Sequence, residues 1–204
     1  MWETPIFFAR TILSSLLFFA LAWLFFDTLF LRIEAGTLLK GIGFFFLGIS
    51  QITEITRYFS ALPLPFVSIG IAALGLYFIL VAYLFDAHSK LQFLVVVIIA
   101  SLFLLKDHVL LAACAFVISI TVLHIAHYTK HKDLIPLGVG FVLIAIGEFF
   151  YFLDTTSQFN RITVAGDFLY IFAAVNYAVW LWPYLFIRFK KDRSLSRLEP
   201  ADNS

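Results

Sequence analysis

Charge and cysteine are both scarce in this sequence of 204 residues. Only 13% of the residues are charged, and the single cysteine, Cys114, excludes a disulfide within the chain. Soluble domains carry roughly 25% charged residues, and a soluble core of this size could not bury a chain that is 62% apolar. The N-terminus lacks the basic region and cleavage site of a signal peptide. We therefore expect an all-α integral membrane protein, and basic clusters suited to nucleic acid are absent apart from a short tail.

Seven apolar segments are candidates to cross a bilayer, which takes about 20 residues of helix. They are residues 5–31, 38–59, 64–85, 90–106, 108–128, 135–153 and 165–188. The fourth is the weakest because only Leu91 to Leu105 is free of charge, and a re-entrant hairpin with the fifth segment is the rival interpretation. The sequence predicts one seven-helix transmembrane domain over residues 1–189 and a flexible tail over 190–204.

The distribution of basic residues predicts the orientation in the membrane. Ten of the 14 Lys and Arg residues fall on the side of the C-terminus, and four fall on the other side. Because cytoplasmic loops are enriched in Lys and Arg, the C-terminus is expected in the cytoplasm and the N-terminus outside. The plasma (inner) membrane is the expected location.

Two pairs of short motifs suggest an internal repeat. Gly41-Ile-Gly-Phe44 opens the second segment, and Gly138-Val-Gly-Phe141 opens the sixth, 97 residues later. Tyr83-Leu-Phe85 closes the third segment, and Tyr184-Leu-Phe186 closes the seventh, 101 residues later. These spacings predict two parallel halves, about 5–85 and 108–188, joined by a linker helix over 90–106. The alternative is that such short matches arise by chance in a biased composition.

This plan of three helices, a linker and three more helices resembles the architecture of SWEET-type sugar carriers and, more loosely, of microbial rhodopsins. The resemblance is confined to architecture. The seventh segment has no lysine between Thr163 and Ile187, which excludes a retinal Schiff base there. The chain also has no Pro-Gln pair of the kind that SWEET-type carriers use.

Several polar residues fall at depths that place them inside the predicted bundle, where ionisable groups usually face the interior or a wet cavity. They are Arg10, Gln51, Glu54, Glu148 and Asn176. These residues predict a site for a solute or ion, with Asn176 as its floor and Glu148 as the strongest candidate, because no cation lies near Glu148 in the sequence. The alternative is structural: Arg10 pairs with a glutamate, and Glu54 pairs with Arg57 on one helix face.

Three histidines lie on one helix face that runs from the end of the fifth segment into the cytoplasm, namely His124, His127 and His131. Imidazoles on one face could ligate zinc or a haem iron. No cysteine ligand accompanies them, and histidine is also common as an anchor at membrane interfaces. We therefore expect no cofactor, with zinc or haem as the alternative.

Together these features predict a small-solute or ion carrier, or a channel-like protein, with a polar site between two three-helix halves and no enzymatic activity. The first alternative is a non-enzymatic membrane sensor or an accessory subunit of a membrane complex. The second is a metal- or haem-binding redox or hydrolytic protein. The expected partners are membrane lipid and a small solute or ion, and a second copy of the chain or a membrane complex remains open.

Overall fold

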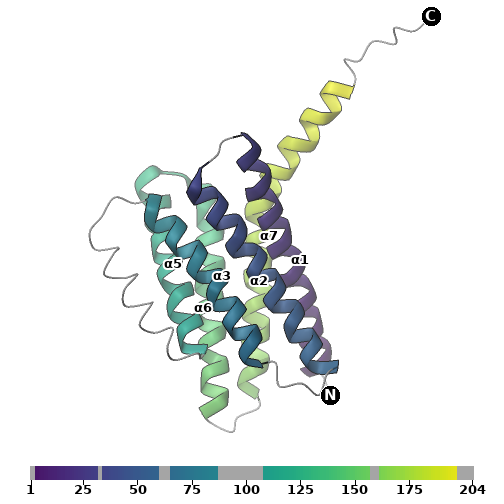
Figure 1. The fold of residues 1–204 in the computed structure, drawn as a ribbon, viewed down its shortest axis with the longest axis vertical. Helices are drawn as coiled ribbons and strands as arrows, with labels where there is room; N and C mark the ends of the chain where they lie inside the picture. Colours follow the sequence, from purple (N-terminus) through teal and green to yellow (C-terminus); the bar gives the residue numbers. More distant parts are fainter. Residues whose placement is uncertain (1–2, 32–33, 60–64, 87–107, 157–160, 197–204) are drawn as a thin grey trace, which may run out of the picture.

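The computed structural model describes residues 3–31, 34–59, 65–86, 108–156 and 161–196. Within these ranges the chain is all helical, as predicted. The elements are α1 (Glu3–Leu31), α2 (Ala35–Phe59), α3 (Pro65–Asp86), α5 (His108–Thr129), the short 3-10 helix η2 (Lys132–Leu134), α6 (Ile135–Thr156) and α7 (Arg161–Ser196) (Figure 1).

Five of the described helical segments are long and apolar enough to cross a membrane. They are Thr4–Phe30, Ala35–Thr56, His108–Thr129, Lys132–Asp154 and Ile162–Phe186. Val67–Tyr83 of α3 is a shorter apolar helix. The bundle is therefore of the kind that spans a membrane. The predicted fourth segment, residues 90–106, and its hairpin alternative lie outside the described residues, so the count of seven spans stays a prediction.

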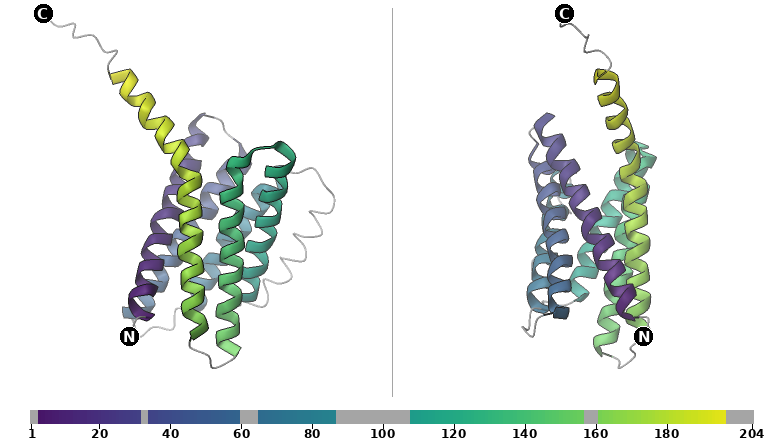
Figure 2. Two further views of the ribbon diagram at one scale, coloured as in Figure 1. Left: turned by 180° about the vertical axis from the view of Figure 1, so that it is seen from behind. Right: turned by 90° about the vertical axis from the view of Figure 1, so that its right-hand side faces the viewer.

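The helices form a ring. Each packs against the next described helix along the chain, and α1 closes the ring against α7. Figures 1 and 2 show α1, α3, α5 and α7 starting at the end where the N-terminus lies, while α2 and α6 run the opposite way. We call this end the polar end and the opposite end the far end.

Four aromatic rings from four different helices contact one another in the interior of the bundle. Phe18, Phe44, Phe141 and Tyr177 come from α1, α2, α6 and α7, and none is more than 2% exposed. Their ring centroids lie 6.3 Å apart for Phe18–Phe44, 6.1 Å for Phe44–Phe141, 5.5 Å for Phe141–Tyr177 and 6.0 Å for Phe18–Tyr177. These separations are typical of attractive aromatic pairs. We call this group the aromatic quartet.

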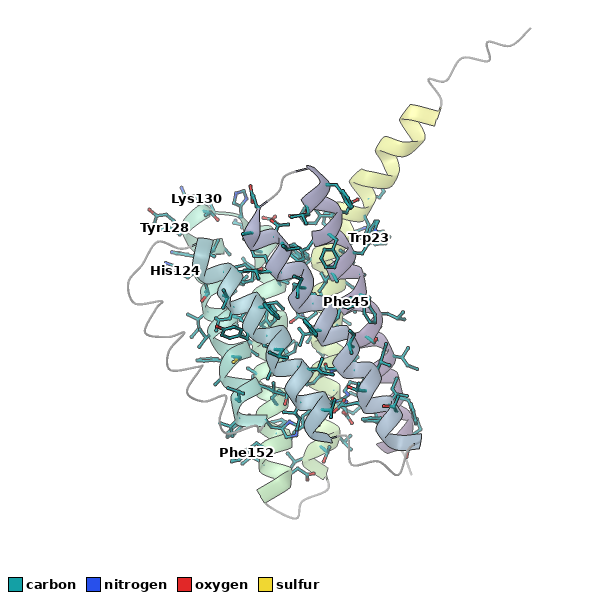
Figure 3. The ribbon with its side chains drawn as sticks, viewed as in Figure 1. Trp23, Phe45, His124, Tyr128, Lys130 and Phe152 are labelled. Atoms are coloured by element: carbon teal, nitrogen blue, oxygen red, sulfur yellow. The ribbon has the colours of Figure 1, made fainter. Side chains whose placement is uncertain are left out.

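Large apolar side chains also cover the outside of the bundle. Trp23 and Phe45, labelled in Figure 3, are 48% and 43% exposed. Such an apolar exterior around a packed interior suits a lipid environment, because lipid tails solvate apolar side chains that water would not.

Helix α7 continues well beyond the other helices at the far end (Figure 1). It contains Pro183 and remains helical to Ser196, past residue 190 where we expected the flexible tail to begin. Residues 197–204 lie outside the described ranges. The last turns of α7 thus extend a helix whose sequence includes Arg188, Lys190 and Lys191.

Candidate functional site

Two adjoining cavities lie toward the polar end of the bundle. The inner cavity has a volume of about 30 Å³ and is lined by residues from all six long helices. The second, which we call the vestibule, has a volume of about 230 Å³ and is lined by residues nearer to the helix ends, such as Phe7 and Asp154. Arg10, Glu54 and His108 line both cavities and mark the boundary between them. The volume of the inner cavity is enough for roughly one or two water molecules.

Arg10 is the buried cation of the site and is only 3% exposed. Its guanidinium forms an ion pair with Glu54 of α2 and donates a hydrogen bond to the hydroxyl of Tyr151. Its Nε lies 3.3 Å from Oδ1 of Asp167, which also accepts a hydrogen bond of 2.6 Å from the Tyr151 hydroxyl. The guanidinium carbon lies 5.0 Å from the ring centroid of Phe7, 5.2 Å from that of Tyr170 and 5.4 Å from that of Tyr151. Two carboxylates and three rings therefore hold one permanent positive charge.

Glu148 also lines the inner cavity and is 5% exposed. One carboxylate oxygen, Oε2, lies 2.6 Å from Nδ1 of His108 on α5. The other, Oε1, accepts a hydrogen bond from the hydroxyl of Tyr170 on α7. The His108 ring also lies 5.6 Å from the Tyr151 ring, so Tyr151 contacts both His108 and Arg10.

Two oxygen atoms that line the cavities have no hydrogen-bond partner among the described residues. Gln51 is 7% exposed and lines the inner cavity, and its Oε1 is unpartnered. Asp154 lines the vestibule, and its Oδ2 accepts a 2.7 Å hydrogen bond from Thr163 while its Oδ1 is unpartnered. Both atoms are acceptors, and buried acceptors are usually satisfied. Nε of Arg10, a donor that borders both cavities, also has no hydrogen-bond partner among the described residues.

The structure brings together four of the five residues predicted for a polar site. Arg10, Gln51, Glu54 and Glu148 all line the inner cavity. Asn176 lines neither cavity, because its amide donates a 2.9 Å hydrogen bond to the carbonyl of Phe172 on its own helix. Phe18 of the aromatic quartet lines the inner cavity in place of the polar floor expected from Asn176.

One of the two ion pairs expected in the structural alternative is present. Arg10 does pair with a glutamate, Glu54. The second pair of that alternative, Glu54 with Arg57, involves a side chain outside the described residues. Pairing and ligand binding are compatible here, because Arg10 and Glu54 both border the cavities while they contact each other.

Sequence reasoning missed four residues of the site, namely His108, Tyr151, Asp167 and Tyr170. The sequence does contain a pattern that could have indicated Tyr151, Asp167 and Tyr170. Polar residues recur three positions apart near the same end of three helices: Gln51 with Glu54, Glu148 with Tyr151, and Asp167 with Tyr170. Residues at that spacing share a helix face, so each pair points to one side.

The three histidines predicted as metal ligands lie away from this site: His124 and His127 are on α5, and His131 follows it. His124, labelled in Figure 3, is near the far end, and its ring lies 6.4 Å from that of Tyr128. His127 is exposed, and His131 Nδ1 lies 3.8 Å from Oδ1 of Asp133. Across the described ranges, no group of three or more His, Cys, Asp or Glu side chains could hold a metal ion. The zinc or haem alternative thus gains no ligand set from the described structure.

Comparisons of the chain with protein families, curated proteins and solved structures found no match. The function must therefore be argued from the site itself.

Proposed function

We propose that the protein is a membrane carrier or channel-like protein for a small monovalent metal cation. Charge is the observation that carries this proposal. Four described acidic residues line the two cavities, namely Glu54, Glu148, Asp154 and Asp167. The described basic residues that line them are Arg10 and His108. Four carboxyl groups against one guanidinium and one imidazole attract cations into the cavities.

The size and chemistry of the cavities favour a metal cation over an organic one. The inner cavity of about 30 Å³ admits Na⁺ or K⁺ with few of their water molecules, whereas the vestibule of about 230 Å³ has room for a hydrated ion. The three nearby aromatic rings already lie against Arg10, so they are not open to an organic ammonium group. Carboxylate and amide oxygens, as in Glu148 and Gln51, are ligands that hard cations prefer.

The proposal includes the arrangement of two parallel halves, with seven spans, an external N-terminus and a cytoplasmic C-terminus. Matching helix contacts support the two halves: α1–α2 corresponds to α5–α6, α2–α3 to α6–α7, and α1–α7 to α5–α3. Gly41 of α2 faces Phe26 of α1, and Gly138 of α6 faces Leu123 of α5, with each residue of the second pair 97 positions after its counterpart. The site would then lie between the halves, within the outer part of the membrane.

Uptake into proteoliposomes tests the proposal. Purified full-length protein is reconstituted, and the uptake of radioactive sodium and of rubidium as a substitute for potassium is measured. We expect uptake of at least one of these ions above protein-free liposomes. Glu148→Gln should lower it by about tenfold or more, because losing a charged ligand worth about 1.4 kcal/mol weakens binding tenfold.

Glu34→Gln is the matched control, because Glu34 is exposed and lines neither cavity. This variant should transport like the natural protein. The proposal is contradicted if neither ion is taken up, or if Glu148→Gln and Glu34→Gln transport equally well.

A role as an accessory subunit is the second candidate, and the projecting part of α7 favours it. The helix continues past the bundle to Ser196 and carries Arg188, Lys190, Lys191 and Arg193 in that part of the sequence. A protein that docks on a partner through this segment would lose its activity when residues 189–204 are removed. A stand-alone carrier would keep its cation uptake.

A further inference from the structure

The part of α7 that projects from the bundle is the most basic stretch of the chain. It follows directly on the apolar segment Ile162–Phe186 and remains helical to Ser196. Within residues 187–196 one residue is acidic, Asp192, and four are basic, namely Arg188, Lys190, Lys191 and Arg193. The excess of positive charge therefore begins immediately after the apolar part of the helix.

We propose that this projecting part of α7 binds the headgroups of anionic phospholipids in the leaflet at the far end. Clusters of four or more Lys and Arg residues directly after a transmembrane helix are attracted to anionic lipid. In the proposed orientation this end faces the cytoplasm, where the leaflet carries a negative surface potential. The inference does not depend on cation transport, because it concerns the end of the molecule opposite to the two cavities.

The four basic residues follow the span at the depth of the lipid headgroups. Trp182 and Tyr184 are exposed, and side chains of these two types gather where lipid meets water. With a helical rise of about 1.5 Å per residue, Arg188 lies about 3 Å and Arg193 about 10 Å along the helix beyond Phe186. The headgroup layer of one leaflet is about 5–8 Å thick. The basic residues thus begin inside this layer and end near its outer edge.

The connection between α5 and α6 lies at the same level. Its acidic residue, Asp133, accepts a 3.4 Å hydrogen bond from the hydroxyl of Tyr184, at the point where α7 leaves the bundle. Lys130 and Lys132 belong to the same connection and are exposed, and Lys130 is labelled in Figure 3. A second element therefore presents basic side chains at this level, which also suits a negatively charged membrane surface.

The direction of α7 favours lipid as the ligand. In Figures 1 and 2 the projecting part leans away from α5 and α6 and does not fold back over the bundle. Pro183 lies inside the helix, and a proline bends a helix because it removes a backbone hydrogen bond and clashes with the preceding turn. A helix that leans outward passes over the lipid next to the bundle.

An acidic partner protein is the other class of ligand for such a segment. The observations favour lipid, because the basic residues start within the headgroup layer. A soluble partner would have to displace the headgroups before it could contact Arg188. The anionic headgroups are already present at that depth.

Hydrogen exchange of the backbone amides tests the proposal. Full-length protein is placed in nanodiscs of phosphatidylcholine, either alone or mixed with phosphatidylglycerol, and exchange is followed by mass spectrometry. We expect exchange over residues 187–196 to be slower by about tenfold or more in the anionic nanodiscs, because bound headgroups oppose opening of the helix. Exchange in α5, inside the bundle, should be the same in both. The difference should disappear in about 1 M salt, where the Debye length is about 3 Å.

Two pairs of substitutions test whether charge is the cause. Lys190→Gln with Lys191→Gln removes two charges and keeps a residue of similar helix propensity, so the effect of anionic lipid on exchange should shrink by about tenfold. Lys130→Gln with Lys132→Gln is the matched control, because it makes the same two changes at exposed residues outside α7. This control should leave exchange over residues 187–196 unchanged.

The outcomes separate lipid from a partner protein. Equal exchange over residues 187–196 in both kinds of nanodisc overturns the lipid proposal and leaves the segment to an acidic partner. Slower exchange that survives high salt, or that survives the loss of Lys190 and Lys191, also overturns it, because the contact is then not one of charge. Cation uptake is measured separately, so its failure leaves the lipid proposal standing.

Discussion

The two groups of three helices, α1 to α3 and α5 to α7, pack alike and differ in chemistry. In each, the second helix carries a glycine that allows a close neighbour: Gly43 faces α3, and Gly140 faces the Tyr177 ring of α7. At the polar end, however, the first half supplies a permanent charge in Arg10, and the second supplies an imidazole in His108. The comparison teaches that similar packing places two pairs of a base and a carboxylate at the same end of the bundle, while single residues decide whether the base is a permanent cation or an imidazole.

The polar cavities and the aromatic quartet form a second contrast along the bundle. The cavities contain unpartnered acceptors and room for solvent, whereas the quartet is buried and closely packed. Phe18 belongs to both regions, since it lines the inner cavity and contacts Phe44. Phe18 thus joins the polar cavities to the packed aromatic core of the bundle.

The largest predicted effect is on the permanent pair. Arg10→Met leaves the carboxylates of Glu54 and Asp167 without their cation, which should lower stability by about 3–5 kcal/mol. Thermal unfolding in detergent measures the loss. Lys132→Met, at an exposed residue of η2, is the control. Equal melting temperatures for the two variants would show that the Arg10 network contributes no more than an exposed lysine.

An intermediate effect is expected where the helices of the first half meet. A Cβ at Gly43 would lie 2.7 Å from the carbonyl oxygen of Gly75, which is backbone of α3 and cannot turn aside. Gly43→Ala should therefore cost about 1–3 kcal/mol through overpacking. Gly70→Ala is the matched control, because a Cβ at Gly70 meets nothing within 4 Å. Thermal unfolding should rank Gly43→Ala clearly below Gly70→Ala, and the reverse order would refute this account of the packing.

The smallest effect concerns Asn176, the predicted site residue that the structure places outside both cavities. Its amide bonds to the backbone of its own helix, so Asn176→Ala should change stability by no more than about 0.5 kcal/mol. Cation uptake should also be unchanged. A loss of uptake comparable to that of Glu148→Gln would contradict this prediction and show that Asn176 contributes to the site.

Much of the fold could be predicted from the sequence, because an apolar segment of about 20 residues predicts a helix that crosses a bilayer. The segment predicted at 108–128 is α5, His108–Thr129, and the one predicted at 135–153 is α6, Ile135–Thr156. The two ends of the seventh segment, predicted at 165–188, were harder to predict. Helix α7 starts at Arg161 and ends at Ser196, since charged residues end an apolar run without ending a helix.

The inner face of each helix was much harder to predict. In a membrane bundle, apolar side chains cover the lipid-facing surface as well as the interior, so no apolar stripe marks the inner face. Phe44 is fully buried while its neighbour Phe45 is 43% exposed. An isolated charged residue such as Glu148 is easy to recognise in an apolar segment, and the sequence alone therefore predicted it. His108 lies at the start of α5, and its pairing with Glu148 depends on helix contacts that the sequence does not display.

The central claim is that a monovalent cation binds beside Glu148, and ligand-dependent stability tests it most directly. The melting temperature of the purified protein is compared in sodium chloride, potassium chloride and N-methylglucamine chloride at equal concentration. A bound ion at about 100 times its dissociation constant stabilises a protein by about 2.7 kcal/mol. We predict a higher melting temperature in at least one of the two metal salts, and loss of that increase in Glu148→Gln but not in Glu34→Gln. Equal melting temperatures in all three salts, or an increase that survives Glu148→Gln, would contradict a cation site at this carboxylate.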